Sequence, residues 1–176
     1  MIDNTGMHRQ AQFISSPNHD DRPDAEITLA VIHNISLPPG EYGGNGVIEL
    51  FTNQLDPGAH AYYAEVYQLK VSAHFFIRRD GSLIQFVSCL KRAWHAGLSN
   101  WQGRERCNDF SVGIELEGSN HDPFEDAQYL RLNLLLEALK AAYPIKAVVG
   151  HSDIAPERKT DPGPYFDWSR IISDCN

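Results

Sequence analysis

The sequence is poor in cysteine, and the three cysteines that it has are widely spaced. They lie at positions 89, 107 and 175, an odd number without any CxxC pair. Disulfide frameworks and thiolate zinc sites both need paired or closely spaced cysteines. We therefore expect neither feature, and reduced thiols in a reducing compartment are the simpler interpretation.

Positive charge is also scarce. There are 15 Lys and Arg residues against 23 Asp and Glu residues, which makes the formal net charge −8. This balance argues against a sequence-independent grip on nucleic-acid phosphates, but it does not exclude a locally basic site for an anionic substrate. No window approaches the roughly 18 apolar residues of a membrane span, and residues 1–26 show no signal-peptide pattern. We expect a cytoplasmic protein with no nucleic-acid partner and no membrane partner.

What the sequence does have is an ordinary globular composition. Its 176 residues are 42% hydrophobic and 22% charged, which is enough to bury a core without oligomerisation. We expect a monomer with one domain over residues 1–176, in which the polar residues 1–26 form an extended, loop-like lead-in. Strand and helix patterns then alternate without repeats or linkers. This order predicts an α/β (α+β) fold with a single mixed sheet and helices packed on it.

Two short apolar strands are expected to end at histidines. Residues 27–32 are apolar and β-branched, and His33 follows them directly. Residues 145–150 form a similar run that leads into His151. The Pro- and Gly-rich residues 37–47 predict a long loop, of the kind in which sites and lids tend to lie.

The remaining strands are predicted from alternating patterns. Residues 72–87 form two alternating runs around Asp80-Gly81, which is a strong hairpin turn. Residues 110–118 predict another strand. Its alternation sends two carboxylates and four apolar residues to opposite faces, namely Glu115 and Glu117 against Phe110, Val112, Ile114 and Leu116.

Residues 126–143 predict the one long helix of the chain, which Pro144 ends. Shorter helices or turns are expected at 47–55 and 61–69, and a brief one near the C-terminus. Residues 93–109 are polar and predict a loop. The apolar face of the long helix is expected to consist of Leu130, Leu134, Leu135, Ala138, Leu139 and Ala142.

Two histidines and an aspartate are candidates for a zinc site. His33 and His151 lie where strands break into polar segments, and Asp161 follows in a loop that Pro162 and Pro164 stiffen. Catalytic zinc commonly takes three His or carboxylate ligands and leaves a fourth position for water. From spacing alone, however, ordinary surface or hydrogen-bonded histidines are the better interpretation.

The other six histidines have simpler interpretations. His74 lies in an apolar strand and is expected to be a hydrogen-bonded core residue. His95 follows Trp94 at the head of a loop and is better interpreted as a groove residue. The remaining four lie in polar stretches and are expected at the surface: His8, His19, His60 and His121.

Five sequence blocks carry a family resemblance that is far more specific than the spacing. They are VIHNISLPPGEYGG, VSAHFFIRRDGSLIQFV, RAWHAG, QGRERCNDFSVGIELEG and GHSDIAPERKTDPGPYFDW, and the similarity runs from about Ser16 to Trp168. In these blocks the chain resembles the zinc N-acetylmuramoyl-L-alanine amidases, which are related to a bacteriophage lysozyme and to the peptidoglycan recognition proteins. Within that family it is most similar to the cytoplasmic anhydro-muropeptide amidases of bacterial cell-wall recycling.

The resemblance implies a metal site and its catalytic partners. His33, His151 and Asp161 fall on the ligands that hold one Zn²⁺ per chain in the family. Glu115 falls on the catalytic glutamate and Lys159 on the catalytic lysine. Phage and animal relatives usually have cysteine at the third ligand position, so the carboxylate of Asp161 points to the recycling amidases.

The resemblance also implies a reaction and a substrate groove. The reaction is hydrolysis of the amide between the lactyl group of 1,6-anhydro-N-acetylmuramic acid and L-alanine in a small muropeptide. Arg106 could hold a stem carboxylate by two parallel hydrogen bonds, although it could also be an ordinary surface arginine. The resemblance also implies an aromatic hydroxyl near the site, which corresponds to Tyr62, with Tyr63 and Tyr67 as competitors. The implied groove residues are Asn34, Tyr62, Trp94 and Arg106.

The roles assigned to these residues fit the chemistry of amide hydrolysis. The reaction needs an activated water, stabilisation of the oxyanion and a proton for the leaving nitrogen. Glu115 could move the proton and Lys159 could share the negative charge with zinc, although in isolation both would be ordinary solvated residues. Two alternatives remain: a peptidoglycan-binding module of the same fold without catalysis, and an amidase that acts on intact murein.

Overall fold

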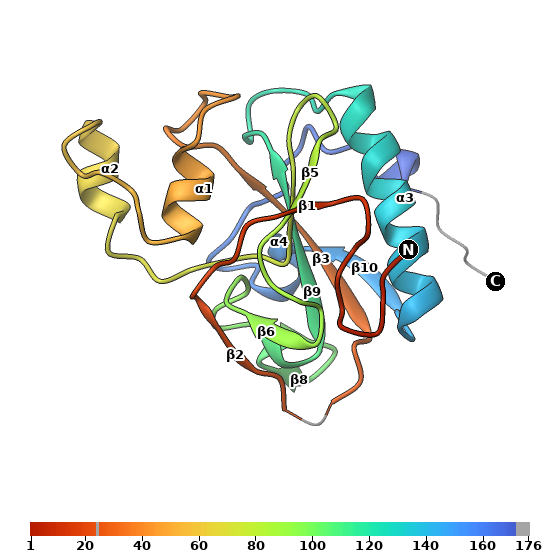
Figure 1. The fold of residues 1–176 in the computed structure, drawn as a ribbon. Helices are drawn as coiled ribbons and strands as arrows, with labels where there is room; N and C mark the ends of the chain where they lie inside the picture. The colour runs from red at the N-terminus through yellow and green to blue at the C-terminus, as the bar shows by residue number, and fades with distance from the viewer. Residues whose placement is uncertain (24, 172–176) are drawn as a thin grey trace.

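A six-stranded sheet lies at the centre of the computed structural model, which describes residues 1–23 and 25–171. Its strands follow the order β1-β5-β4-β9-β3-β10 (Figure 1). In this order their bounds are Gln12–Phe13, Leu83–Gln85, Phe75–Ile77, Ser111–Glu117, Leu29–Ile35 and Ala147–Gly150. The β4–β5 pair is antiparallel and the other four pairs are parallel. The predicted mixed sheet and the predicted hairpin at 72–87 are both confirmed.

One long helix, several short ones and two small ribbons surround the sheet. The α-helices of the described residues are α1 (Gly46–Phe51), α2 (Ala61–Val66), α3 (Asp126–Ala142) and α4 (His151–Ile154). Single 3₁₀ turns form η1 (Cys107–Asp109) and η2 (Trp168–Arg170). The ribbons pair β2 (His19–Asp21) with β6 (Lys91–Ala93) and β7 (Asn100–Trp101) with β8 (Arg104–Glu105). No helix in the described part of the chain is long and apolar enough to cross a membrane.

The prediction of a simple loop over residues 93–109 is wrong, because this segment holds the β7–β8 ribbon and η1. The ribbon turns at Gln102 and Gly103, which both have positive φ (51° and 85°). Two consecutive positive φ angles define the tight turn that suits a hairpin, but Asn-Gly or Asp-Gly usually marks it. Glutamine at the first position hides the turn from a sequence pattern.

Alternation along the strands separates the two faces of the sheet. Phe75 and Ile77 of β4 pack in the cluster under α3, whereas Phe76 packs in the cluster that includes α1 and α2. These helices lie on opposite sides of the sheet (Figure 1). The predicted apolar face of β9 is confirmed for Val112, Ile114 and Leu116, which join the α3 cluster. Glu115 therefore projects on the face away from α3.

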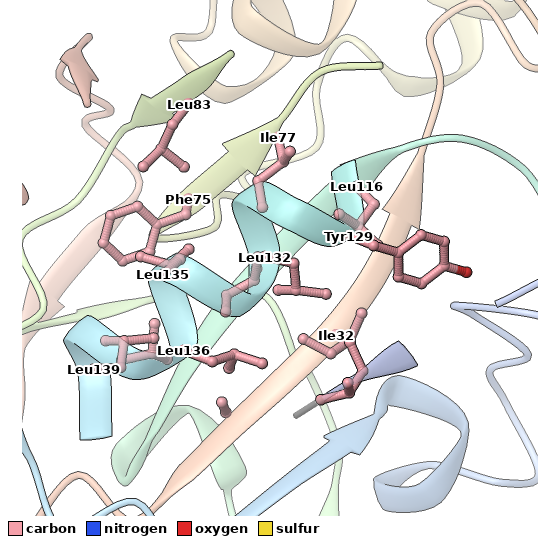
Figure 2. Close-up of a cluster of buried hydrophobic side chains, with 14 of the residues drawn as sticks. Ile32, Phe75, Ile77, Leu83, Leu116, Tyr129, Leu132, Leu135, Leu136 and Leu139 are labelled. Carbon is pink, nitrogen blue, oxygen red and sulfur yellow. The ribbon is translucent and has the colours of Figure 1, made fainter. Parts of the chain in front are cut away.

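The long helix is confirmed, but its predicted buried face is partly wrong. Leu130 and Leu134 are 66% and 48% exposed. The helix instead packs on the sheet through a stripe one step around its axis, as Figure 2 shows for several of these side chains: Tyr129, Leu132, Leu135, Leu136 and Leu139. A buried amide explains the rotation, because Gln128 Nε2 donates to the carbonyls of Ile77 and Glu117 at the ends of two strands.

Replacing Gln128 with leucine should destabilise the protein by about 1–3 kcal/mol, because two buried strand carbonyls lose their donor. The substitution also removes the oxygen that accepts the Glu125 N–H at the start of α3. Urea unfolding followed by circular dichroism measures the change. Leu134→Gln on the exposed side is the matched control, and we expect a shift within about 0.5 kcal/mol. Equal shifts for the two variants would contradict the role of Gln128.

The sequence predicts that the central strand β3 ends at His33, but the strand continues to Ile35. Parallel pairing with β9 extends it, because the register runs from Leu29↔Ser111 to Ile35↔Glu117. In this register His33 lies beside Glu115. Neighbouring residues in paired strands share a face, so both side chains project to the side opposite α3.

The N-terminal lead-in, for which the sequence predicts an extended loop, also contributes to the main sheet. Its strand β1 adds an edge to the main sheet beside β5. The buried amide of Gln85 fixes the preceding turn, since it accepts the N–H of His8 and donates to the carbonyl of Gly6. The prediction that His8 is a surface residue is therefore wrong: it is buried and its ring contacts Phe75 edge-on.

Candidate metal centre and active site

Three elements bring His33, His151 and Asp161 together. His33 lies on β3, and His151 begins α4 directly after β10, which pairs with β3 in the register Gly150↔Ile32. The two histidines therefore leave adjacent strands at the same end of the sheet. The loop after α4 folds back, because the Ser152 N–H donates to the carbonyl of Asp161 at 2.9 Å. That hydrogen bond returns the aspartate to the histidines.

The facing atoms of these residues form a nearly equilateral triangle. His33 Nδ1 lies 3.0 Å from His151 Nδ1 and 3.0 Å from Asp161 Oδ2, and His151 Nδ1 lies 3.1 Å from the same oxygen. Two imidazoles and a carboxylate are ligands that zinc prefers. A tetrahedral ion with bonds of about 2.0–2.1 Å separates its ligand atoms by roughly 3.3 Å. The group could thus hold a metal ion with little movement.

Hydrogen bonding on the far side of the rings supports this interpretation. The Nε2 of His151 lies 3.0 Å from the carbonyl oxygen of Ala96, which can only accept, so that nitrogen carries the proton. A neutral His151 then presents an unprotonated Nδ1 to the triangle. The Nε2 of His33 lies 3.0 Å from Nδ1 of His95. A cluster of lone pairs that face one another fits a cation.

The electrostatics favour the protonation states that bind metal. Burial lowers the pKa of His33 to about 4, so its imidazole is neutral near pH 7. Burial alone would raise the pKa of Asp161, but the imidazoles of His151 and His33, which lie 3.1 and 3.0 Å from its Oδ2, outweigh that effect and hold the pKa well below its usual range. A neutral imidazole beside an ionised carboxylate, as at His33 and Asp161, is the form that coordinates zinc.

Glu115 is not on a solvated face, because it is only 8% exposed. Its Oε2 is buried and has no hydrogen-bond partner. Burial, and then the negative charge of Asp161, raise its pKa well above the usual value, and the charge of Lys159 acts in the opposite direction. A buried carboxyl group of this kind, beside a candidate metal site, suits general acid–base chemistry.

A pocket of about 280 Å³ opens above these groups. Glu115, Lys159 and the three candidate ligands line its polar part. Lys159 is half-buried on the loop that follows α4, and its N–H donates to the carbonyl of Ala155. The rest of the lining is mostly apolar and includes Leu37, Leu50, Phe51, Val66, Leu69 and Val71. The pocket therefore joins a reactive polar end to a surface for an apolar group.

Three of the four predicted groove residues line this pocket: Asn34, Tyr62 and Trp94. Of the competing tyrosines, Tyr63 is buried and donates its hydroxyl to the carbonyl of Leu37, and Tyr67 is exposed and contacts Gln68. Only Tyr62 of the three lines the pocket. Asn34 donates to Asn120 Oδ1 and to the carbonyl of Pro162, and so ties the pocket rim together.

Arg106 is the predicted groove residue that the structure does not bring to this pocket. Its side chain is 70% exposed and lies 3.3 Å from a carboxylate oxygen of Asp109. It lines a separate depression of about 490 Å³, together with residues from 97–105 and 154–158.

The prediction for His74 is confirmed, and that for His95 is incomplete. His74 is fully buried and accepts the N–H of Gly113 through Nδ1. His95 lines the pocket but also contacts His33, which the sequence analysis missed. No local pattern identifies this contact, because the two histidines are far apart in the chain and His95 reaches His33 from the loop after β6, with its ring packed against Gly113 of β9.

Comparison with known proteins identifies the family. The family described as N-acetylmuramoyl-L-alanine amidase matches residues 23–164. The chain is 56% identical over 174 residues to the 1,6-anhydro-N-acetylmuramyl-L-alanine amidase AmpD of Enterobacter cloacae, covering 97% of this chain and 93% of the relative. A crystal structure of an AmpD derivative superposes with a TM-score of 0.94 at 54% identity, with 97% of each chain covered.

More distant structures share the fold. The amidase AmiD of Escherichia coli, solved with the substrate anhydro-N-acetylmuramic acid-L-Ala-D-gamma-Glu-L-Lys, aligns with a TM-score of 0.61 at 31% identity, covering 96% of this chain and 63% of that one. The peptidoglycan recognition protein PGRP-SA of Apis mellifera aligns at 0.64 with 13% identity, covering 93% and 98%, which supports the fold alone. The family match, the high identity over nearly the whole length and the shared fold agree: the chain belongs to the N-acetylmuramoyl-L-alanine amidase family.

Proposed function

We propose that the protein is a zinc amidase that hydrolyses the bond between the lactyl group of 1,6-anhydro-N-acetylmuramic acid and L-alanine in small muropeptides. The high similarity to AmpD proteins supports this substrate. The observation that carries the proposal is the pocket in which His33, His151 and Asp161 lie beside the unpaired carboxyl of Glu115. We also propose one amidase domain over residues 1–176, while a cytoplasmic location and a monomeric state stay predictions.

The proposed mechanism divides the work between the pocket residues. When bound, zinc supplies a water of lowered pKa and polarises the scissile carbonyl. Glu115 takes a proton from the attacking water on its free Oε2 and returns it to the leaving amide nitrogen. The ammonium of Lys159 shares the negative charge that develops on the carbonyl oxygen. Tyr62 and Trp94 provide the walls against which the substrate packs.

Two alternatives are less well supported. A binding module without catalysis would have no use for an unpaired buried carboxyl beside the ligand triangle, because such a group costs stability. An amidase that acts on intact murein would use the same pocket, so only a test with both substrates distinguishes this alternative from the proposed function. The similarity to AmpD, over 97% of the chain, favours the anhydro-muropeptide.

Mass spectrometry of the products tests the proposal. Purified anhydro-muropeptide and intact sacculi are each incubated with the enzyme, with a chelator, and with the chelator already saturated with zinc. We expect the anhydro-muropeptide to yield the free peptide and the free sugar, and only the unsaturated chelator to stop the reaction. Cleavage of sacculi alone would favour the murein alternative. Binding without cleavage would favour a binding module, and cleavage insensitive to chelation would exclude the metal.

Replacing Lys159 with methionine should lower kcat by about 10²-fold, because the oxyanion loses one stabilising group of a kind worth 10²–10³ in other enzymes. Methionine keeps most of the length and the apolar stem, so KM and zinc content should change little. Steady-state kinetics with anhydro-muropeptide measure the effect. Lys146→Met is the matched control, because Lys146 is exposed and directly precedes β10, at the end of that strand away from His151. A kcat like that of the control would remove Lys159 from the reaction.

A further inference from the structure

His95 and Ala96, which are adjacent in the chain, contact the two candidate histidine ligands on the side away from the ligand triangle. Nδ1 of His95 lies 3.0 Å from Nε2 of His33, and the carbonyl oxygen of Ala96 lies 3.0 Å from Nε2 of His151. Both contacts are made on the ring nitrogens that face away from the ligand triangle. Adjacent residues therefore control the far sides of both rings.

The donors and acceptors here fit together in only one way if His33 binds metal through Nδ1. Its proton must then lie on Nε2 and be donated to Nδ1 of His95, which has to be unprotonated. The proton of His95 in turn lies on its own Nε2, which is 3.1 Å from Oγ of Ser111. The chain of hydrogen bonds His33→His95→Ser111 runs in one direction and fixes the tautomers of both rings.

The surroundings hold His95 rigidly. Oδ1 of Asn108 accepts the backbone N–H groups of both His95, at 3.2 Å, and Ala96, at 2.8 Å. Gly113 on β9 leaves room for the ring, because a Cβ at that position would overlap the imidazole of His95. Both ring nitrogens are engaged with protein groups. This leaves neither nitrogen for substrate, although the ring lines the pocket.

We propose that His95 is a positioning residue for the metal: its Nδ1 accepts the Nε2–H of His33 and so presents Nδ1 of His33 to the ion. The inference rests on the proposed function, since it needs a zinc ion at the triangle. Outer hydrogen-bond partners of this kind typically account for 10–100-fold in metal affinity. Ala96 plays the same part for His151 through its backbone, which no side-chain substitution removes.

A matched pair of variants isolates the acceptor. Asparagine at position 95 places Oδ1 close to where Nδ1 of His95 lies, whereas leucine has the same shape without an acceptor. Both lose the contact with Ser111, and the pair tests whether position 95 offers an acceptor to the Nε2–H of His33. We expect His95→Leu to raise the zinc Kd by about 10–100-fold and His95→Asn to stay within a few fold of the parent. Competition with a chromogenic chelator gives the Kd, and the absorption spectrum of the Co²⁺-loaded proteins reports the ligand geometry.

A second measurement does not depend on the variants folding. The imidazole ¹H–¹⁵N spectrum of the zinc-loaded parent should show His33, His95 and His151 all protonated at Nε2. A proton on Nδ1 of His95 would overturn the inference, as would equal zinc affinity in His95→Leu and the parent, or equal losses in the two variants. A parent that hydrolyses anhydro-muropeptide without binding zinc would instead overturn the proposed zinc chemistry, and the inference with it.

Discussion

Replacing Glu115 with glutamine is expected to lower kcat by about 10²–10⁴-fold, while zinc content and KM stay near those of the parent. This range is typical for the loss of a positioned general acid–base group. Glutamine keeps the size of the side chain but cannot accept a proton from water. Because Glu115 touches none of the three candidate ligands through a hydrogen bond, the metal should remain in place. Kinetics with anhydro-muropeptide and elemental analysis of the purified variant measure both quantities.

Glu117 is the matched control for this substitution. It is a second buried carboxylate on β9, but it accepts the N–H groups of Gly43 and Arg79 instead of lining the pocket. Glu117→Gln should therefore reduce stability, by about 1–3 kcal/mol, and leave kcat within a few fold. Turnover at the parent rate in Glu115→Gln would refute the proton-transfer role. Equal losses of kcat in the two variants would indicate a general effect of altering the strand.

Much of the fold was predictable because its strands and its long helix carry strong local patterns. The hairpin turn at Asp80-Gly81 and the alternation on β9 are determined by residues close in sequence. The rotation of α3 was not predictable, because leucines occur on both of its faces and the buried amide of Gln128 selects one of them. A polar anchor of this kind is invisible to a pattern of apolar residues.

The candidate site, like the fold, was predictable only in part. The family blocks point to the ligand triangle and to Glu115. The strands that carry His33 and Glu115 are paired, and His151 and Asp161 join them from the segment that follows β10. Spacing alone could not place Arg106, because its left-handed backbone conformation and its contact with Asp109 are local features that no residue pattern marks. The contact between His95 and His33 was equally hidden, because it depends on how the loop after β6 packs against β9, far from His33 in the sequence.

Replacing Asp161 with alanine is expected to abolish hydrolysis and to raise the zinc Kd by at least about 100-fold, more than the loss of an outer partner. Asp161 supplies the one negative charge of the ligand triangle, and two neutral imidazoles alone leave a divalent ion incompletely neutralised. Asp161→Asn is the graded control, because it keeps an oxygen near the same position without the charge. Its affinity should fall between those of the parent and the alanine variant.

Thermal unfolding with and without zinc tests this prediction independently of activity. A ligand that binds only the folded state stabilises it by about 2.7 kcal/mol at a free concentration of 100 times Kd. At the zinc concentration that gives this gain in the parent, Asp161→Ala should gain no more than about 0.4 kcal/mol, because a Kd raised 100-fold or more leaves its site at most half occupied. An unchanged zinc-dependent rise in Tm would remove Asp161 from the ligand set. If the rise vanishes while the metal-free Tm stays close to that of the metal-free parent, the aspartate acts through the ion and not through the fold.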